Sequence, residues 1–139
     1  MAGETNGSFA GFTNAGSYDP FLVKLRANGA PEWVRQLGSP GEDYGYAVGL
    51  DLRGNVYLAG DTPGRIDGGA GEDGGFFVAR YGLGGEDRGV RQFGSANEFI
   101  EDAAVDPLGG VTVTGSTGGD LTGAGNAGAV DAFVSRLTW

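Results

Sequence analysis

The hydrophobic residues of this chain fall in short runs separated by turn residues, and the runs repeat. A run at residues 21–25 returns at 77–81 and again at 133–137, reading FLVKL, FVARY and FVSRL, so its phenylalanines recur every 56 positions. Self-similarity at a fixed period of this size is the signature of a repeat architecture. The pattern therefore predicts repeated supersecondary units rather than one irregular core.

Each repeat contains four apolar runs of strand length. Residues 46–50 and 56–60 flank a connection that ends in Gly54-Asn55, which is a strong hairpin signal. The same pattern recurs at 103–114, around Gly109-Gly110. A long loop rich in Gly, Asp and Asn follows, then the Phe-containing run, a second Gly-bearing turn, and a last run at 33–38 or 89–94. We expect four strands in each repeat.

Several of these runs are apolar on both faces, because Phe21 and Val23 point one way along a strand and Leu22 points the other. A strand buried on both sides needs a layer above and below it, which favours sheets stacked face to face. No helix-length window places apolar residues at i, i+3, i+4 and i+7, so we expect no substantial α-helix. The predicted fold class is all-β, built from four-stranded antiparallel β-propeller blades.

The repeat divides the chain into parts of one β-propeller repeat region at 1–139. Its units cover about 19–74 and 75–130, with a partial unit at 131–139 and a partial leading unit at 1–18. The strand at 46–51 would be innermost and the strand at 33–38 outermost. This arrangement predicts about ten strands, or about two and a half four-stranded blades per chain.

Such a chain cannot close a propeller alone, since a closed ring uses roughly 4–8 blades. Uncovered blade faces and strand edges are surfaces for pairing or aggregation. The chain would be completed by self-assembly, be part of a longer propeller, or adopt another compact β fold. The expected partner is a second copy in a homo-oligomer, with a dimer favoured, or neighbouring propeller blades.

Five short words follow one another at residues 7–16, 19–25, 33–38, 41–46 and 54–60, reading GSFAGFTNAG, DPFLVKL, WVRQLG, GEDYGY and GNVYLAG. Their order and spacing resemble the bacterial β-propeller repeat family called the SBBP-type repeat. The second copy departs most, with Gly74-Gly75-Phe76 where Asp-Ala is expected and Gly89 in place of Trp. The resemblance implies a propeller fold and an extracellular or cell-surface bacterial context, although the chain starts without the features of a signal peptide.

Composition and charge narrow the functional classes. The formal net charge is −9, so neither nucleic acid nor an anionic membrane surface is an expected partner. The chain has no Cys and no His, which removes disulfides, thiol nucleophiles, imidazole bases and the usual zinc or haem ligands. No run approaches the ~20 apolar residues that span a bilayer, so no membrane insertion is expected.

The loops before the Phe-containing runs carry the densest set of oxygen ligands. Calcium takes roughly six to eight oxygen ligands, and glycine lets backbone carbonyls turn toward an ion. The alternative is that Asp and Asn cap turns through their own backbone. No cofactor is expected unless calcium binds here. The calcium candidates are Asp67, Glu72, Asp73, Asp120, Asn126 and Asp131.

Acidic pairs lie near the starts of the predicted inner strands, where they could face a central channel. Paired carboxylates could perform acid–base chemistry if burial raised one pKa, whereas the alternative is a solvated acidic rim. The aromatic residues Trp33, Tyr44, Tyr46 and Tyr57 could stack on a sugar, or could pack between blades. The ligand-binding candidates are Glu42, Asp43, Tyr44, Glu101 and Asp102, and no catalytic residue is assigned.

These features predict a non-enzymatic β-propeller scaffold or interaction module. Stacked sheets would hold loops rigidly, and those loops or the channel mouth would contact a partner. A carbohydrate- or calcium-binding module is the first alternative, and a hydrolase using channel carboxylates is the second. The ligand stays open, because a fold does not by itself specify a function.

Overall fold

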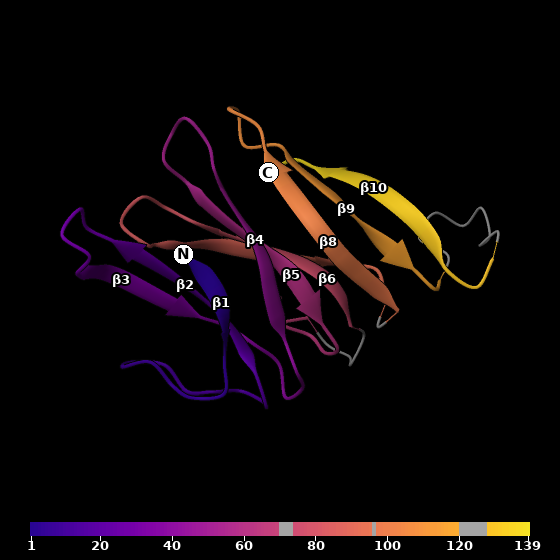
Figure 1. The fold of residues 1–139 in the computed structure, drawn as a ribbon, viewed down its shortest axis with the longest axis horizontal. Coiled ribbons are helices and arrows are strands. Elements are labelled where there is room, and N and C mark those ends of the chain that lie inside the picture. The colour runs from indigo at the N-terminus through magenta and orange to yellow at the C-terminus, as the bar shows by residue number, and fades with distance from the viewer. Residues whose placement is uncertain (70–73, 96, 120–127) are drawn as a thin grey trace.

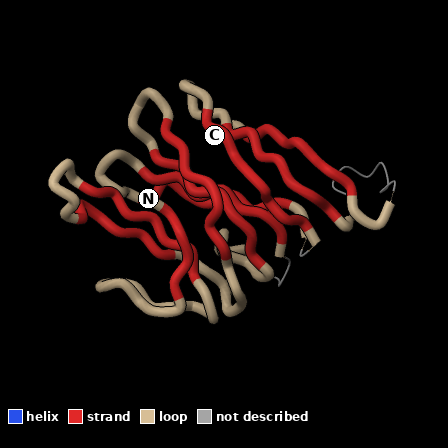
Figure 2. The backbone as a smooth tube through the Cα atoms, viewed as in Figure 1, coloured by secondary structure: helices blue, strands red, loops and turns tan. Residues whose placement is uncertain are grey.

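A computed structural model describes residues 1–69, 74–95, 97–119 and 128–139, and in this part of the chain every regular element is a β-strand (Figure 2). The prediction of an all-β fold is confirmed. Since these residues form no helix, none of them provides a helical span long and apolar enough to cross a membrane. The strands are β1 (Ala2–Thr5), β2 (Asp19–Leu25), β3 (Pro31–Gln36), β4 (Tyr44–Leu50), β5 (Val56–Thr62), β6 (Gly75–Tyr81), β7 (Asp87–Phe93), β8 (Glu98–Val105), β9 (Val111–Thr117) and β10 (Asp131–Leu137).

The strands form three small antiparallel sheets, which follow one another across the structure in chain order (Figure 1). The first sheet has the order β1-β2-β3, the second β4-β5-β6-β7 and the third β10-β9-β8. The second sheet is the complete four-stranded unit predicted from the repeat. The first sheet corresponds to its last three strands, and the third sheet corresponds to its first three.

The sheets pack face to face, and the second sheet is covered on both sides. Along β5, Val56 and Leu58 pack toward the first sheet, whereas Tyr57 and Ala59 pack toward the third. Along β6 the same alternation places Phe77 on one side and its neighbours on the other. The double-sided burial explains why these strands read as continuous apolar runs rather than alternating ones.

The recurring phenylalanine occupies the same place in every sheet, on the face directed toward the preceding sheet. Phe77 is fully buried against the first sheet, and Phe133 packs against the second. Phe76 stacks on Phe133 with ring centroids 5.5 Å apart. Phe21 has no preceding sheet in this structure, and the ring of Phe9 from the β1–β2 loop lies 5.1 Å from it instead.

Aspartates close the hairpins that join the first two strands of the second and third sheets. Asp51 Oδ1 accepts hydrogen bonds from the backbone N–H groups of Arg53 and Asn55, both at 2.9 Å. Asp106 Oδ1 accepts the equivalent bonds from Leu108 and Gly110. These backbone donors, led by Gly110, hold the pKa of Asp106 below its usual range. The repeated Asp is therefore a turn-forming residue, as Asx turns require.

Side chains on the last strand of one sheet donate hydrogen bonds to backbone carbonyls just after the third strand of the next sheet. Trp33 Nε1 donates to the Leu83 carbonyl at 3.1 Å, and Arg35 Nε donates to the Gly85 carbonyl at 2.6 Å. Arg91 repeats the role of Arg35 at the second interface, donating to the Thr138 carbonyl at 2.7 Å. The contact between neighbouring sheets is therefore repeated in its polar rim as well as in its apolar centre.

Candidate functional site

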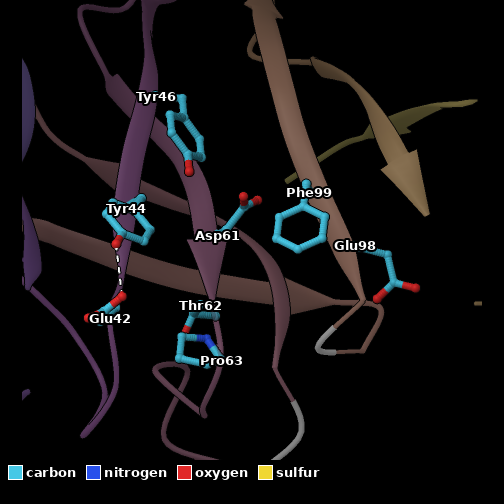
Figure 3. Close-up of a pocket in the computed structure, with 8 residues that line it drawn as sticks. All are labelled: Glu42, Tyr44, Tyr46, Asp61, Thr62, Pro63, Glu98 and Phe99. Atoms are coloured by element: carbon cyan, nitrogen blue, oxygen red, sulfur yellow. Dashed lines mark hydrogen bonds between the residues drawn. The ribbon is translucent and has the colours of Figure 1, made fainter. Parts of the chain in front are cut away.

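A small pocket opens between the inner strands of the second and third sheets, with a volume of about 130 Å³ (Figure 3). Strands β4 and β5 supply one wall and the start of β8 supplies the other. The pocket combines exposed aromatic rings with carboxylates. Its lining residues are Glu42, Tyr44, Tyr46, Asp61, Thr62, Pro63, Glu98 and Phe99.

Two β-bulges shape this pocket. The register of β4 against β5 shifts between Gly45 and Ala47, and that of β8 against β9 shifts at the equivalent place, between Ile100 and Asp102. At this point the two sheets are joined by a buried hydrogen bond, in which the Ile100 N–H donates to Asp61 Oδ1 at 2.7 Å. Bulges redirect local side chains and backbone groups, and here they accompany a polar link between sheets.

Asp61 is the most strongly perturbed carboxyl group in the pocket. Burial raises its pKa to about 6, the Ile100 N–H and the Tyr46 hydroxyl act in the opposite direction, and the charge of Glu101 adds to the increase. Burial likewise raises the pKa of Tyr46 to about 12, with the Asp61 charge as the next cause. Figure 3 shows the Tyr46 hydroxyl directed toward Asp61 from the neighbouring strand. The site therefore holds a carboxyl group that titrates close to neutral pH.

Three tyrosine rings, those of Tyr18, Tyr44 and Tyr46, form a stack beside β4. The ring centroids of Tyr18 and Tyr44 lie 6.3 Å apart, those of Tyr44 and Tyr46 lie 6.2 Å apart, and both pairs are close to parallel. The Tyr44 hydroxyl donates to Glu42 Oε2 at 3.0 Å. Half of the Tyr46 surface and 55% of Phe99 remain exposed. Exposed rings beside hydrogen-bond acceptors can bind a ligand that has both an apolar face and donor groups.

A buried acidic residue lies at the start of β4 and at the start of β8, and each accepts a hydrogen bond from the loop that precedes its strand. Asp43 Oδ2 accepts from the Ser39 N–H at 2.7 Å, and burial raises the Asp43 pKa. Glu98 does the same in the third sheet, accepting from the Ser95 N–H and from the Thr117 hydroxyl. The acid follows its serine by four residues in one loop and by three in the other. The longer glutamate side chain spans the difference.

The structure places the predicted ligand-binding residues in different surroundings. Glu42 and Tyr44 line the pocket. Asp43 is fully buried on the loop side and bonded to Ser39, so its carboxylate does not line the pocket. Glu101 and Asp102 are exposed on β8, where Glu101 influences Asp61 electrostatically and Asp102 accepts from the adjacent Ala103 N–H.

The aromatic residues considered for sugar stacking also separate into two groups. Trp33 and Tyr57 are buried between sheets, which corresponds to the packing alternative. Tyr44 and Tyr46 belong to the pocket. The pocket residues that sequence reasoning did not select are Asp61, Thr62, Pro63, Glu98 and Phe99. The repeat held a signal for two of them, because Glu98 and Phe99 align with Asp43 and Tyr44.

Most of the calcium candidates, Glu72, Asp73, Asp120 and Asn126, lie outside the described residues. Asp67 accepts from Arg65 Nε at 3.1 Å and from the Gly69 N–H at 2.9 Å, so it forms an ion pair and a turn. Asp131 begins β10, opposite Thr117. Within the described ranges, no group of three or more acidic side chains could hold a metal ion. Calcium binding by these loops stays a prediction.

Comparison with known proteins bears on the fold rather than on a ligand. No curated protein matches this chain. A family model does match residues 32–66, which run from the last strand of the first sheet through the first two strands of the second. Residues 32–66 carry an SBBP beta-propeller repeat.

Proposed function

We propose that this chain is a non-enzymatic interaction module that binds another β-propeller blade through the open faces of its first and third sheets. A second copy of the chain is the favoured partner, because each copy would present both kinds of face. The single observation that carries the proposal is the exposure of Val134 on the outer face of the third sheet.

Val134 is the third-sheet counterpart of a fully buried residue. Val78 of β6 pairs with Ala59 of β5, and Val134 of β10 pairs with Thr114 of β9 in the same register. Val78 is 0% exposed because the third sheet covers it, whereas Val134 is 73% exposed. Burying a valine side chain contributes roughly 1.5–3 kcal/mol, so covering this face is favourable.

The first sheet presents the complementary kind of face. Val23 and Val34 pair across β2 and β3 on the side away from the second sheet. On this face Leu25 is 45% exposed, whereas Val23 is only 7% exposed within the chain. Because the sheets of one chain already stack in a fixed order, a third sheet of one copy can continue onto the first sheet of another. Two chains of three sheets would give a ring within the usual range of roughly 4–8 blades.

The assembly is tested by molar mass in solution. Sedimentation or light scattering of the intact chain should give a dimer that dissociates on dilution. Val134→Glu should weaken association by about tenfold or more, because it places a charge in the interface. Leu52→Glu is the matched control, since Leu52 is 83% exposed in the β4–β5 turn and lies off both open faces. A monomer at hundreds of micromolar, or equal association of both variants, would refute the proposal.

Carbohydrate binding is the second candidate function, favoured by the exposed Tyr44–Tyr46 stack beside Glu42 and Asp61. Aromatic faces pack on sugar rings, and carboxylates accept hydrogen bonds from hydroxyl groups. A glycan array followed by titration of any bound sugar tests this role. Tyr46→Ala should abolish the binding, whereas a sugar bound equally well by this variant would place its site elsewhere.

A further inference from the structure

Four of the nine basic residues of this acidic chain gather at one end of the interface between the second and third sheets. Arg53 lies in the β4–β5 turn, Arg80 on β6, Arg91 on β7 and Arg136 on β10. The first, second and fourth line a pocket of about 240 Å³, and Arg91 lies over the Trp139 ring at its edge. We call this the arginine pocket, and its other walls include Tyr57, Asp106 and Trp139.

The positive charge in the arginine pocket is only partly compensated. Arg136 pairs with Asp106. Within the described part of the chain, neither Arg53 nor Arg80 forms an ion pair. The guanidinium of Arg80 lies 5.8 Å from the Tyr57 ring centroid and 5.7 Å from that of Trp139. Its Nε is buried and donates no hydrogen bond to any described residue. Leaving a charged donor buried and unpaired is costly, so the charge of Arg80 is not balanced by hydrogen bonds or ion pairs within the described residues.

The neighbouring interface shows how the same position is satisfied within the chain. Lys24 is the counterpart of Arg80 in the first sheet, and its Nζ donates to the Leu83 carbonyl at 2.9 Å and to Glu32 at 3.0 Å. At the second interface Trp139 occupies the place of Leu83, and Arg80 stacks on its ring instead of reaching a carbonyl. Lys24 is therefore paired at the first interface, whereas the Nε of Arg80 is not paired with any described residue.

Asp51, which hydrogen-bonds to the pocket residue Tyr57, is already occupied. Asp51 Oδ2 accepts from Asn55 Nδ2 at 2.7 Å and from the Tyr57 hydroxyl at 3.1 Å, while its other oxygen holds the turn. A ligand must therefore bring its own acceptors. Guanidinium groups present planar pairs of donors that match carboxylate and phosphate oxygens.

We propose that the arginine pocket binds an oxyanion, a carboxylate or phosphate group, carried by a small organic molecule whose apolar part packs on Tyr57 and Trp139. The pocket is smaller than the roughly 300–1,000 Å³ typical of drug-sized ligands, which limits the ligand to one charged group and a short apolar portion. The overall negative charge of the chain opposes anion binding elsewhere, so specificity comes from these arginines.

Two probes and a neutral control test the proposal on the intact chain. Phenyl phosphate and benzoate represent the two sources of the oxyanion, and benzyl alcohol has the ring without the charge. We expect the indole N–H resonance of Trp139 to shift saturably with the anions, the tighter one identifying the preferred group. Trp33 lies at the other interface and is an internal control that should not shift. Benzyl alcohol that binds as tightly as both anions would overturn the proposal.

Variants separate the arginines from general charge effects. Arg53→Gln should weaken binding of the better anion by about tenfold, the usual consequence of losing a charge-assisted hydrogen-bond donor. Arg53 is exposed in a turn, so this variant tests the site without disturbing the core. Arg26→Gln makes the same change in net charge in the β2–β3 turn and should alter the affinity less than about twofold. Equal affinity of Arg53→Gln and Arg26→Gln would overturn the proposal.

Discussion

Replacing Asp61 with Asn should change the pH dependence of stability in a defined direction. The pKa of Asp61 in the folded state is about 6, above the usual value of 3.8 that an aspartate has in the unfolded chain. The folded protein therefore binds more protons than the unfolded chain between about pH 4 and 6. The contribution of Asp61 to stability is present below pH 4 and is lost as the pH rises through 6. In Asp61→Asn this dependence disappears, because the amide does not titrate.

The size of the effect follows from the shift. About two pKa units at ~1.4 kcal/mol per unit give a loss of about 3 kcal/mol between pH 4 and 7. Because Asp61 lines a pocket open to solvent, screening makes this value an upper limit. The amide oxygen can still accept from the Ile100 N–H, so the variant keeps the link between the sheets. Any other cost of the substitution should be independent of pH.

Urea unfolding of both proteins at several pH values between 4 and 7, at one protein concentration, measures this difference. Relative to wild type, Asp61→Asn should gain stability steadily as the pH rises. Asp106→Asn is the control, because backbone hydrogen bonds lower the Asp106 pKa, so the contribution of Asp106 is lost only below its usual value of 3.8 and should change little from pH 4 to 7. A difference between wild type and Asp61→Asn that stays constant from pH 4 to 7 would refute the reasoning.

Three further substitutions test the packing and the turns by the same unfolding assay. Phe77→Ala should cost about 3–5 kcal/mol, since the ring is fully buried between two sheets, and a loss below 1 kcal/mol would contradict the described core. Gly29→Ala should cost about 1 kcal/mol, because Gly29 has a φ of 82° and no atom within 4 Å of an added Cβ, so the effect is conformational alone. Glu98→Asp should cost about 1–3 kcal/mol, because the shorter side chain cannot reach both Ser95 and Thr117. An unchanged stability in Glu98→Asp would show that the loop does not need both bonds.

The strands and their stacking were predictable because their signals are local. Short apolar runs, Gly-bearing turns and a constant spacing specify where strands begin and end. Apolar residues at consecutive positions, such as Phe76 and Phe77, indicate that both faces of a strand are covered. These features need no knowledge of which sheet lies next to which.

The pocket residues were harder to identify because they meet through contacts between sheets. Asp61 and Ile100 are 39 positions apart in the sequence. Their hydrogen bond lies next to a β-bulge, and no Gly, Pro or Asn residue in the sequence marks the position of that bulge. The equivalence of Asp43 and Glu98 can be seen in the repeat only when the difference of one residue in loop length is allowed for. The surroundings of Arg80 likewise depend on Trp139, far along the chain.

The unequal loops that precede β4 and β8 show how such a repeat can lose a residue and keep its architecture. The spacing between the serine and the acid matches the length of the acidic side chain in each loop. Asp43 follows Ser39 by four residues, whereas the longer Glu98 follows Ser95 by three. Exchanging the loops between units would therefore preserve the fold if the acid moved with its loop, whereas a consensus unit that averaged the two copies would combine an acid with a loop of the wrong length.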